Sequence, residues 1–62
     1  MKVSELLKKL HDDGWTLIDQ VGSHRHFKHP VKKGKVTVAG KPSLEIHPKT
    51  LKTIYRQAQW IE

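Results

Sequence analysis

The stretch GSHRHF, residues 22–27, decides how this chain of 62 residues is organised. It follows a β-like run and predicts a tight Gly-Ser turn that leads into a strand. Successive side chains of a strand point to opposite faces, so His24, His26 and Lys28 share one face while Arg25 and Phe27 share the other. If Phe27 is the buried member, His24 is displayed to solvent among positive charges. That placement suits a site that handles phosphate groups.

The segments around this strand predict the order helix, strand, strand, strand, helix. Apolar residues at spacings of three and four predict a helix over 3–13, capped by Ser4 and ended by Gly14 in the left-handed conformation. Further strands are predicted at 15–21 and 35–38, with a turn at 29–34 and a loop at 43–47. A second helix is expected to begin at Pro48. Its apolar stripe comprises Leu51, Ile54, Tyr55, Ala58 and Ile61.

These elements predict an α+β fold in one domain, residues 1–62. Three short antiparallel strands cannot cover both faces of their own sheet, so we expect the two helices to pack together on one face. The other face stays open and carries His24 and His26. Trp15 and Trp60 could stack on bases, but each adjoins an apolar stripe, which favours a place in the core or against a partner.

The charge of the chain points to a polyanionic partner. Twelve Lys and Arg face six Asp and Glu, which gives a net charge of +6 and a pI of about 9.9. Such an excess attracts nucleic acid, although an unspecialised basic surface would look the same. The lysines near the second and third strands are the expected phosphate contacts, or else a solvated charge run. They are Lys28, Lys32, Lys33, Lys35 and Lys41.

Composition also restricts where the chain works and what stabilises it. There is no cysteine, which excludes disulfides and thiolate zinc sites and fits a reducing compartment. No apolar run approaches the length of a membrane span or a signal-peptide core. We therefore expect a cytoplasmic protein with no membrane partner.

Acid–base catalysis by histidine is the most specific function that the residues suggest. Imidazole exchanges protons near neutral pH, and RNA carries its own nucleophile, the 2′-hydroxyl. One or two imidazoles with nearby cations could therefore cleave RNA without a metal or other cofactor. For His24 and His26 this reading and plain surface exposure remain open, whereas His11 and His47 are expected to be ordinary surface residues.

A metal site is the competing reading of the same histidines. His24 and His26 could chelate an ion, with His29 as a third ligand if the strand bends. The motif has no acidic or thiolate residue, and the neighbouring Lys and Arg would repel a cation. We therefore expect no metal here, and we expect His29, next to Pro30, to belong to the surface or the turn.

Several segments together resemble the HicA family of toxins, small ribonucleases of toxin–antitoxin pairs. The likeness covers nearly the whole chain: an opening helix with Ser4-Glu5-Leu6-Leu7, then Gly14-Trp15, Gly22-Ser23-His24, Phe27-Lys28-His29-Pro30, Val36-Thr37-Val38, and a closing Leu51-x-x-Ile54-x-x-Gln57-Ala58. Two positions depart from the family pattern. Arg25 stands where many relatives have a second His, and Gln59 stands where the usual residue is Gly.

The resemblance implies a fold similar to the double-stranded-RNA-binding domain and an endoribonuclease that cuts mRNA and so stops translation. It singles out His24 as the catalytic residue and implies a HicB-type antitoxin that covers the His24 face. The supporting roles that we expect for Gly22, Ser23 and His26 are inferred from the residues themselves. On the residues alone we expect Arg25, Lys28, Lys32, Lys33 and Lys35 to contact RNA. The alternative is a non-catalytic RNA-binding module that uses the same basic face.

Overall fold

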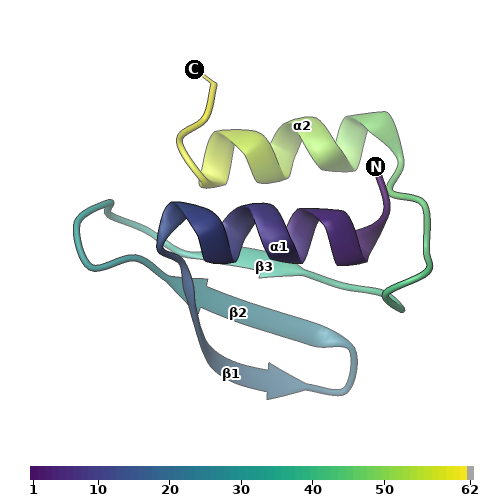
Figure 1. Cartoon of the computed structure of the whole chain (residues 1–62), viewed down its shortest axis with the longest axis horizontal. Coiled ribbons are helices and arrows are strands. Elements are labelled where there is room, and N and C mark those ends of the chain that lie inside the picture. Colours follow the sequence, from purple (N-terminus) through teal and green to yellow (C-terminus); the bar gives the residue numbers. More distant parts are fainter. Residues whose placement is uncertain (62) are drawn as a thin grey trace.

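The computed structural model describes residues 1–61 and has the predicted order of elements (Figure 1). Helix α1 spans Val3–Asp13, the strands are β1 Thr16–Val21, β2 His24–Lys28 and β3 Val36–Val38, and helix α2 spans Pro48–Gln57. The α+β class is thus confirmed, and the arrangement is compatible with a likeness to the double-stranded-RNA-binding domain. Among residues 1–61, neither helix is long and apolar enough to cross a membrane.

The three strands form one antiparallel sheet in the order β1-β2-β3. Phe27 of β2 lies opposite Leu17 on one side and Val36 on the other. Because paired residues point to the same face, these three side chains share the face that carries the core. No helix within residues 1–61 covers the other face.

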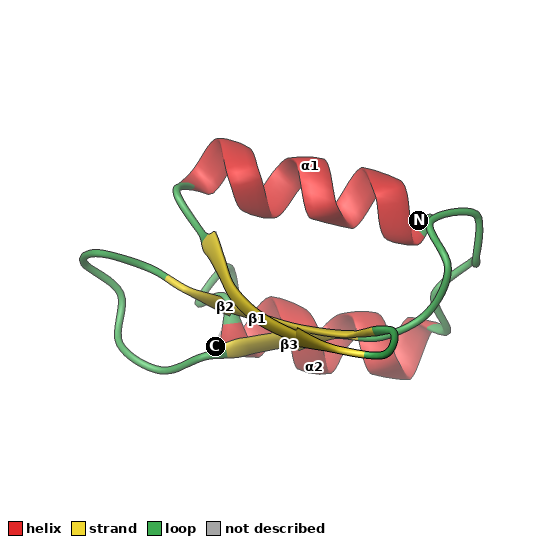
Figure 2. Ribbon diagram, turned by 90° about the horizontal axis from the view of Figure 1, so that it is seen from below, coloured by secondary structure: helices red, strands yellow, loops and turns green. Residues whose placement is uncertain are grey.

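A single core joins both helices to the Phe27 face of the sheet. Its buried members are Val3, Leu6, Leu10, Trp15, Phe27, Val36, Val38, Ile46, Ile54 and Ala58. Figure 2 shows the sheet edge-on with α1 on one side, while α2 runs beside β3 near the level of the sheet. There the Gln57 Oε1 atom accepts a hydrogen bond of 3.3 Å from the Thr37 N–H. Helix α2 therefore covers the β3 edge, and the β1 edge stays open.

The start of α1 is held differently from the prediction. Ser4 is not the cap, because the helix begins at Val3 and Lys2 occupies the N-cap position. The N–H groups of Val3 and Ser4 instead donate to the carbonyls of Leu44 (2.9 Å) and Pro42 (3.0 Å). A chain segment distant in sequence thus satisfies donors that a capping side chain was expected to satisfy.

Both helices end in the same way, with a left-handed residue followed by tryptophan. Gly14 has φ of 101°, as predicted, and Gln59 has φ of 62°. In each case the tryptophan N–H bonds back five residues at 2.9 Å, from Trp15 to α1 and from Trp60 to α2. Because α2 stops at Gln57, Ile61 lies beyond the helix and is 40% exposed, contrary to the predicted stripe.

Candidate functional site

Strand β2 places its histidines on the uncovered face of the sheet. Phe27 is 7% exposed and belongs to the core, which confirms the alternation predicted for this strand. His24 is exposed, and His26 is half-buried with its Nδ1 atom 3.1 Å from the Thr37 Oγ1 atom. The two histidines are roughly 7 Å apart along the strand, from the rise per residue. We call this surface, formed by His24, His26, Lys28 and Thr37, the His24 face.

The hairpin turn presents His24 at the start of β2. Gly22 and Ser23 form a two-residue loop between Val21 and His24, and Gly22 has φ of 59°. A positive φ at the first loop position matches the twist of the flanking strands and favours glycine. No atom lies within 4 Å of a Cβ built on Gly22. The backbone conformation therefore accounts for glycine here, and steric crowding does not.

A β-bulge in β1 adds a carboxylate to this face that the sequence reasoning missed. Ile18 is the extra residue, because Leu17 lies opposite Phe27 while Asp19 lies opposite His26. The bulge turns Asp19 to the His24 face, whereas strict alternation would have put it with Leu17. No motif in the sequence marks a bulge at Ile18. Only the cross-strand register reveals the carboxylate opposite His26.

The same bulge sends Val21 to the His24 face, opposite His24 itself. Strict alternation from Leu17 would put Val21 on the Phe27 face, but the extra residue reverses the alternation. Val21 is 65% exposed, and Leu17 and Ile18 are about half exposed. Along the open β1 edge, Ile18 and Val21 thus form an apolar margin beside the histidines.

Arg25 lies on the Phe27 face, away from His24. Its Nη1 atom donates to the carbonyl of Gly40 at 2.9 Å and, over a longer 3.4 Å, to that of Ser23. The guanidinium therefore ties the hairpin turn to the end of β3. The structure does not bring Arg25 next to the histidines with which the sequence groups it.

The predicted lysines divide into two kinds. Lys28, Lys33 and Lys35 are exposed. The Lys32 side chain is only 25% exposed, and its Nζ atom pairs with Asp13 Oδ2 at 2.7 Å and donates to the Ala58 carbonyl at 3.1 Å. Lys32 thus holds the loop between β2 and β3 against both helices, while the other four lysines, including the exposed Lys41, remain available to a ligand.

Asp13 is the centre of this contact. Its Oδ2 atom also accepts hydrogen bonds of 3.0 Å from the indole Nε1 atoms of Trp15 and Trp60. The hydrogen bond from Lys32, followed by that from Trp60, lowers the pKa of Asp13, and partial burial opposes this shift. We call these four residues, Asp13, Trp15, Lys32 and Trp60, the Asp13 cluster. It confirms that Trp15, 2% exposed, is a core residue.

His29 has a structural position beside this cluster. Its Nε2 atom lies 2.7 Å from the Asp13 carbonyl, and its Nδ1 atom accepts the N–H groups of Val31 and Lys32 at 3.0 Å. This pattern assigns the Nε2–H tautomer. Both ring nitrogens are used, so His29 is not free to be a third metal ligand. Among residues 1–61, no three His, Asp or Glu side chains are gathered to hold a metal ion.

The remaining histidines differ from each other. His11 is exposed on α1, as expected. His47 is more than a surface residue, because it is the N-cap of α2 and its Nδ1 atom accepts the Lys49 N–H at 3.2 Å. Of the five histidines, only His24 and His26 therefore lie on the open sheet face.

The His24 face combines groups that transfer protons with groups that attract anions. Two imidazoles, the Lys28 ammonium and the Thr37 hydroxyl lie together on it, and Asp19 lies across from His26. Imidazole can act as a general acid or base, and an ammonium stabilises charge on a phosphate.

Comparison with known proteins gives this arrangement a family. A family model described as the HicA toxin of bacterial toxin–antitoxin systems matches residues 3–60. A comparison with curated proteins found no significant match. The matched region includes both helices, the whole sheet and the His24 face. The chain therefore belongs to the HicA toxin family, and an antitoxin is its expected partner.

Proposed function

We propose that this toxin is an endoribonuclease that cleaves mRNA and thereby inhibits translation. The observation that carries the proposal is the position of His24, which is exposed at the start of β2 on a sheet face without a helix over it. The net charge of +6 and the exposed Lys28 support RNA as the substrate. Membership of a toxin family supports the effect on growth.

In the proposed reaction, the 2′-hydroxyl oxygen of the RNA attacks the adjacent phosphorus atom, and the bond from phosphorus to the 5′-oxygen breaks. His24 serves as general base or general acid, taking the proton from the 2′-hydroxyl or giving one to the departing 5′-oxygen. The products are a 2′,3′-cyclic phosphate and a 5′-hydroxyl end. DNA lacks the attacking hydroxyl and is not a substrate.

Other residues of the site have supporting roles in this proposal. Gly22 allows the turn that presents His24, and Ser23 donates a hydrogen bond to a phosphate oxygen. Lys28, with Lys33 and Lys35 nearby in the chain, attracts the RNA backbone. His26, held by Thr37, is the second imidazole on the face. Arg25 and Lys32 act through the fold, since both make contacts within the domain.

The test is incubation of purified protein with a labelled mRNA, with and without EDTA. We expect cut fragments with cyclic phosphate ends in both conditions, and none with His24→Ala. Circular dichroism should show that His24→Ala stays folded, because the side chain is exposed. Salt-sensitive RNA binding without cut ends would favour the non-catalytic RNA-binding module. Cleavage retained by His24→Ala would contradict the role of this histidine.

We further propose that a HicB-type antitoxin covers the His24 face in the cytoplasm. The apolar margin of Ile18 and Val21 supports a protein contact there, because exposed apolar side chains beside a polar site are typical of interfaces. An excess of antitoxin should therefore block both RNA binding and cleavage. Binding that leaves cleavage intact would place the antitoxin elsewhere.

A further inference from the structure

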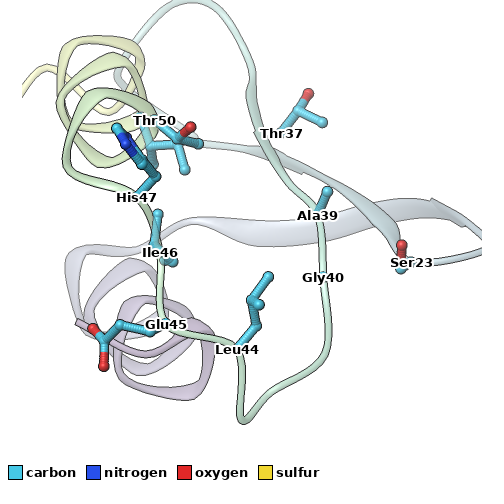
Figure 3. A pocket seen from close by; sticks show the side chains of 10 residues that line it. Ser23, Thr37, Ala39, Gly40, Leu44, Glu45, Ile46, His47 and Thr50 are labelled. Carbon is cyan, nitrogen blue, oxygen red and sulfur yellow. The ribbon is translucent and has the colours of Figure 1, made fainter.

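A pocket of about 560 Å³ lies between the end of β3, the segment 39–47 and the first turn of α2 (Figure 3). Leu44, Ile46 and Ile54 supply apolar walls. Figure 3 shows the Leu44 side chain directed into the space between the two chain segments. The size lies within the range of small-molecule sites, and an apolar wall with a few polar groups is typical of them.

Three residues that carry hydroxyl groups, from different elements, line the same pocket. They belong to Ser23 in the hairpin turn, Thr37 in β3 and Thr50 in α2. His47 also lines it, and its Nε2 atom remains available because Nδ1 caps the helix. Hydrogen-bond donors and acceptors next to the apolar walls of the pocket suit a flat heteroaromatic ring with polar edges.

The pocket is connected to the His24 face by two of its lining residues. Ser23 directly precedes His24 in the chain. Thr37 contacts His26 through the 3.1 Å approach between its hydroxyl and the imidazole. A ligand in the pocket would therefore lie beside the histidines, and a group attached to it could reach them.

The charges around the pocket favour an anionic ligand. Arg25 bonds to the carbonyl of Gly40, which lines the pocket, and Lys41 and Lys49 directly follow and precede lining residues in the chain. Among the described residues that line the pocket, Glu45 is the one carboxylate; it is paired with the N-terminal ammonium, and Figure 3 shows it turned away from the space. A flat polar ring joined to phosphate is the chemistry of a nucleotide.

We propose that this pocket binds a nucleobase of the RNA, splayed out next to the phosphate at which His24 assists cleavage. The inference rests on the proposed ribonuclease function and adds a site that selects among bases. Single-stranded RNA is commonly read in this way, by bases that leave the stack and bond through their edges.

Titration of the 15N-labelled protein with AMP, GMP, CMP and UMP, followed by NMR, tests the proposal. At least one nucleotide should shift the amide signals of Ala39, Ile46 and Thr50, while ribose 5-phosphate, which has no base, should not. Thr50→Trp fills the pocket and should weaken that nucleotide at least tenfold. Thr53→Trp, on the same helix outside the pocket, is the matched control and should leave its affinity unchanged.

The outcomes separate this inference from the proposed function. Pocket amides that do not respond to any nucleotide, or that respond equally to ribose 5-phosphate, overturn it even if the protein still cuts RNA. Pocket amides that respond only to a protein partner also overturn it, because an apolar side chain would then be the occupant. Nucleotide binding in the pocket by a protein that does not cut RNA would support the base site and contradict the ribonuclease.

Discussion

Asp13 connects parts of the chain that are far apart in sequence. Its carboxylate accepts hydrogen bonds from Trp15, just after α1, from Lys32, between β2 and β3, and from Trp60, after α2. A hydrogen bond to a charged group contributes about 1.5–3 kcal/mol, whereas a neutral one contributes about 0.5–1.5 kcal/mol. The lowered pKa of Asp13 reflects this preference for the ionised form.

Replacing this carboxylate should destabilise the domain in a way that depends on pH. We expect Asp13→Asn to lower the free energy of unfolding at pH 7 by about 1–3 kcal/mol, measured by urea denaturation. The folded pKa lies below the ordinary 3.8, so the ionised carboxylate stabilises the fold above that value. This stabilisation is lost as the pH falls through the folded pKa, and the difference from the unmodified protein should then close.

Asp12→Asn is the matched control for this prediction. Asp12 is the preceding residue and pairs with Lys8 at 3.0 Å, but both side chains are largely exposed. Exposed pairs of this kind contribute about 0.5 kcal/mol or less. A difference between Asp13→Asn and the unmodified protein that is the same at every pH would show that the charge of Asp13 is not the stabilising feature.

At the scale of elements, the alternation of side chains along a strand predicted the two faces of β2 correctly but does not describe those of β1. Phe27 and His24 were assigned to the correct faces because β2 is regular, with a period of two. In β1 the extra residue Ile18 reverses the alternation, and no residue type in the sequence marks this bulge. The contacts of Asp13 with Lys32 and of Pro42 with Ser4 could not be predicted from the sequence either. They join segments that are distant in the chain and meet only in the folded protein.

Deleting Ile18 should preserve the pairing of the hairpin. The deletion removes the bulge while leaving Leu17 opposite Phe27 and Asp19 opposite His26. Because Ile18 is about half exposed, we expect a change in the free energy of unfolding within about 1 kcal/mol. NMR should still detect proximity between Asp19 and His26. An unfolded product would show that the bulge itself is required.

Deleting Gln20 is the control for this prediction, because it also shortens β1 by one residue. It also removes the bulge, but the shifted register would put Ile18 opposite His26 and move Asp19 to the Arg25 face. We expect NMR proximity between Ile18 and His26 in this variant. If both deletions gave the same neighbour for His26, the register described for β1 would be wrong.

Across the whole molecule, the basic side chains behind the net charge of +6 are of two kinds. Some make contacts within the fold, and others are exposed and can bind a ligand. Lys32 is committed to the Asp13 cluster, whereas Lys28 is exposed on the His24 face. The sequence could locate both lysines but could not distinguish them, because their difference depends on a tertiary contact. Affinity for RNA and stability of the fold should therefore respond to different lysines.

Two matched variants test this separation in a His24→Ala background, where RNA is bound without being cut. Lys28→Gln should weaken RNA binding and lower the slope of log affinity against log salt by about 0.7, the value for one phosphate contact on a single strand. Lys32→Gln should leave that slope unchanged and lower the free energy of unfolding by about 1–3 kcal/mol. Fluorescence anisotropy of a labelled RNA and urea denaturation give the two readings. Equal slopes for the two variants would refute the distinction.

The meeting of both tryptophans at one carboxylate has a practical consequence. The chain has two tryptophans, and both indoles donate to Asp13. Their ultraviolet emission therefore reports on one location, the junction where the ends of α1 and α2 meet the loop before β3. Neither indole belongs to the His24 face, so the intrinsic emission can follow unfolding while RNA occupies the site. The domain thus carries its own optical probe of integrity, separate from the surface proposed to act on RNA.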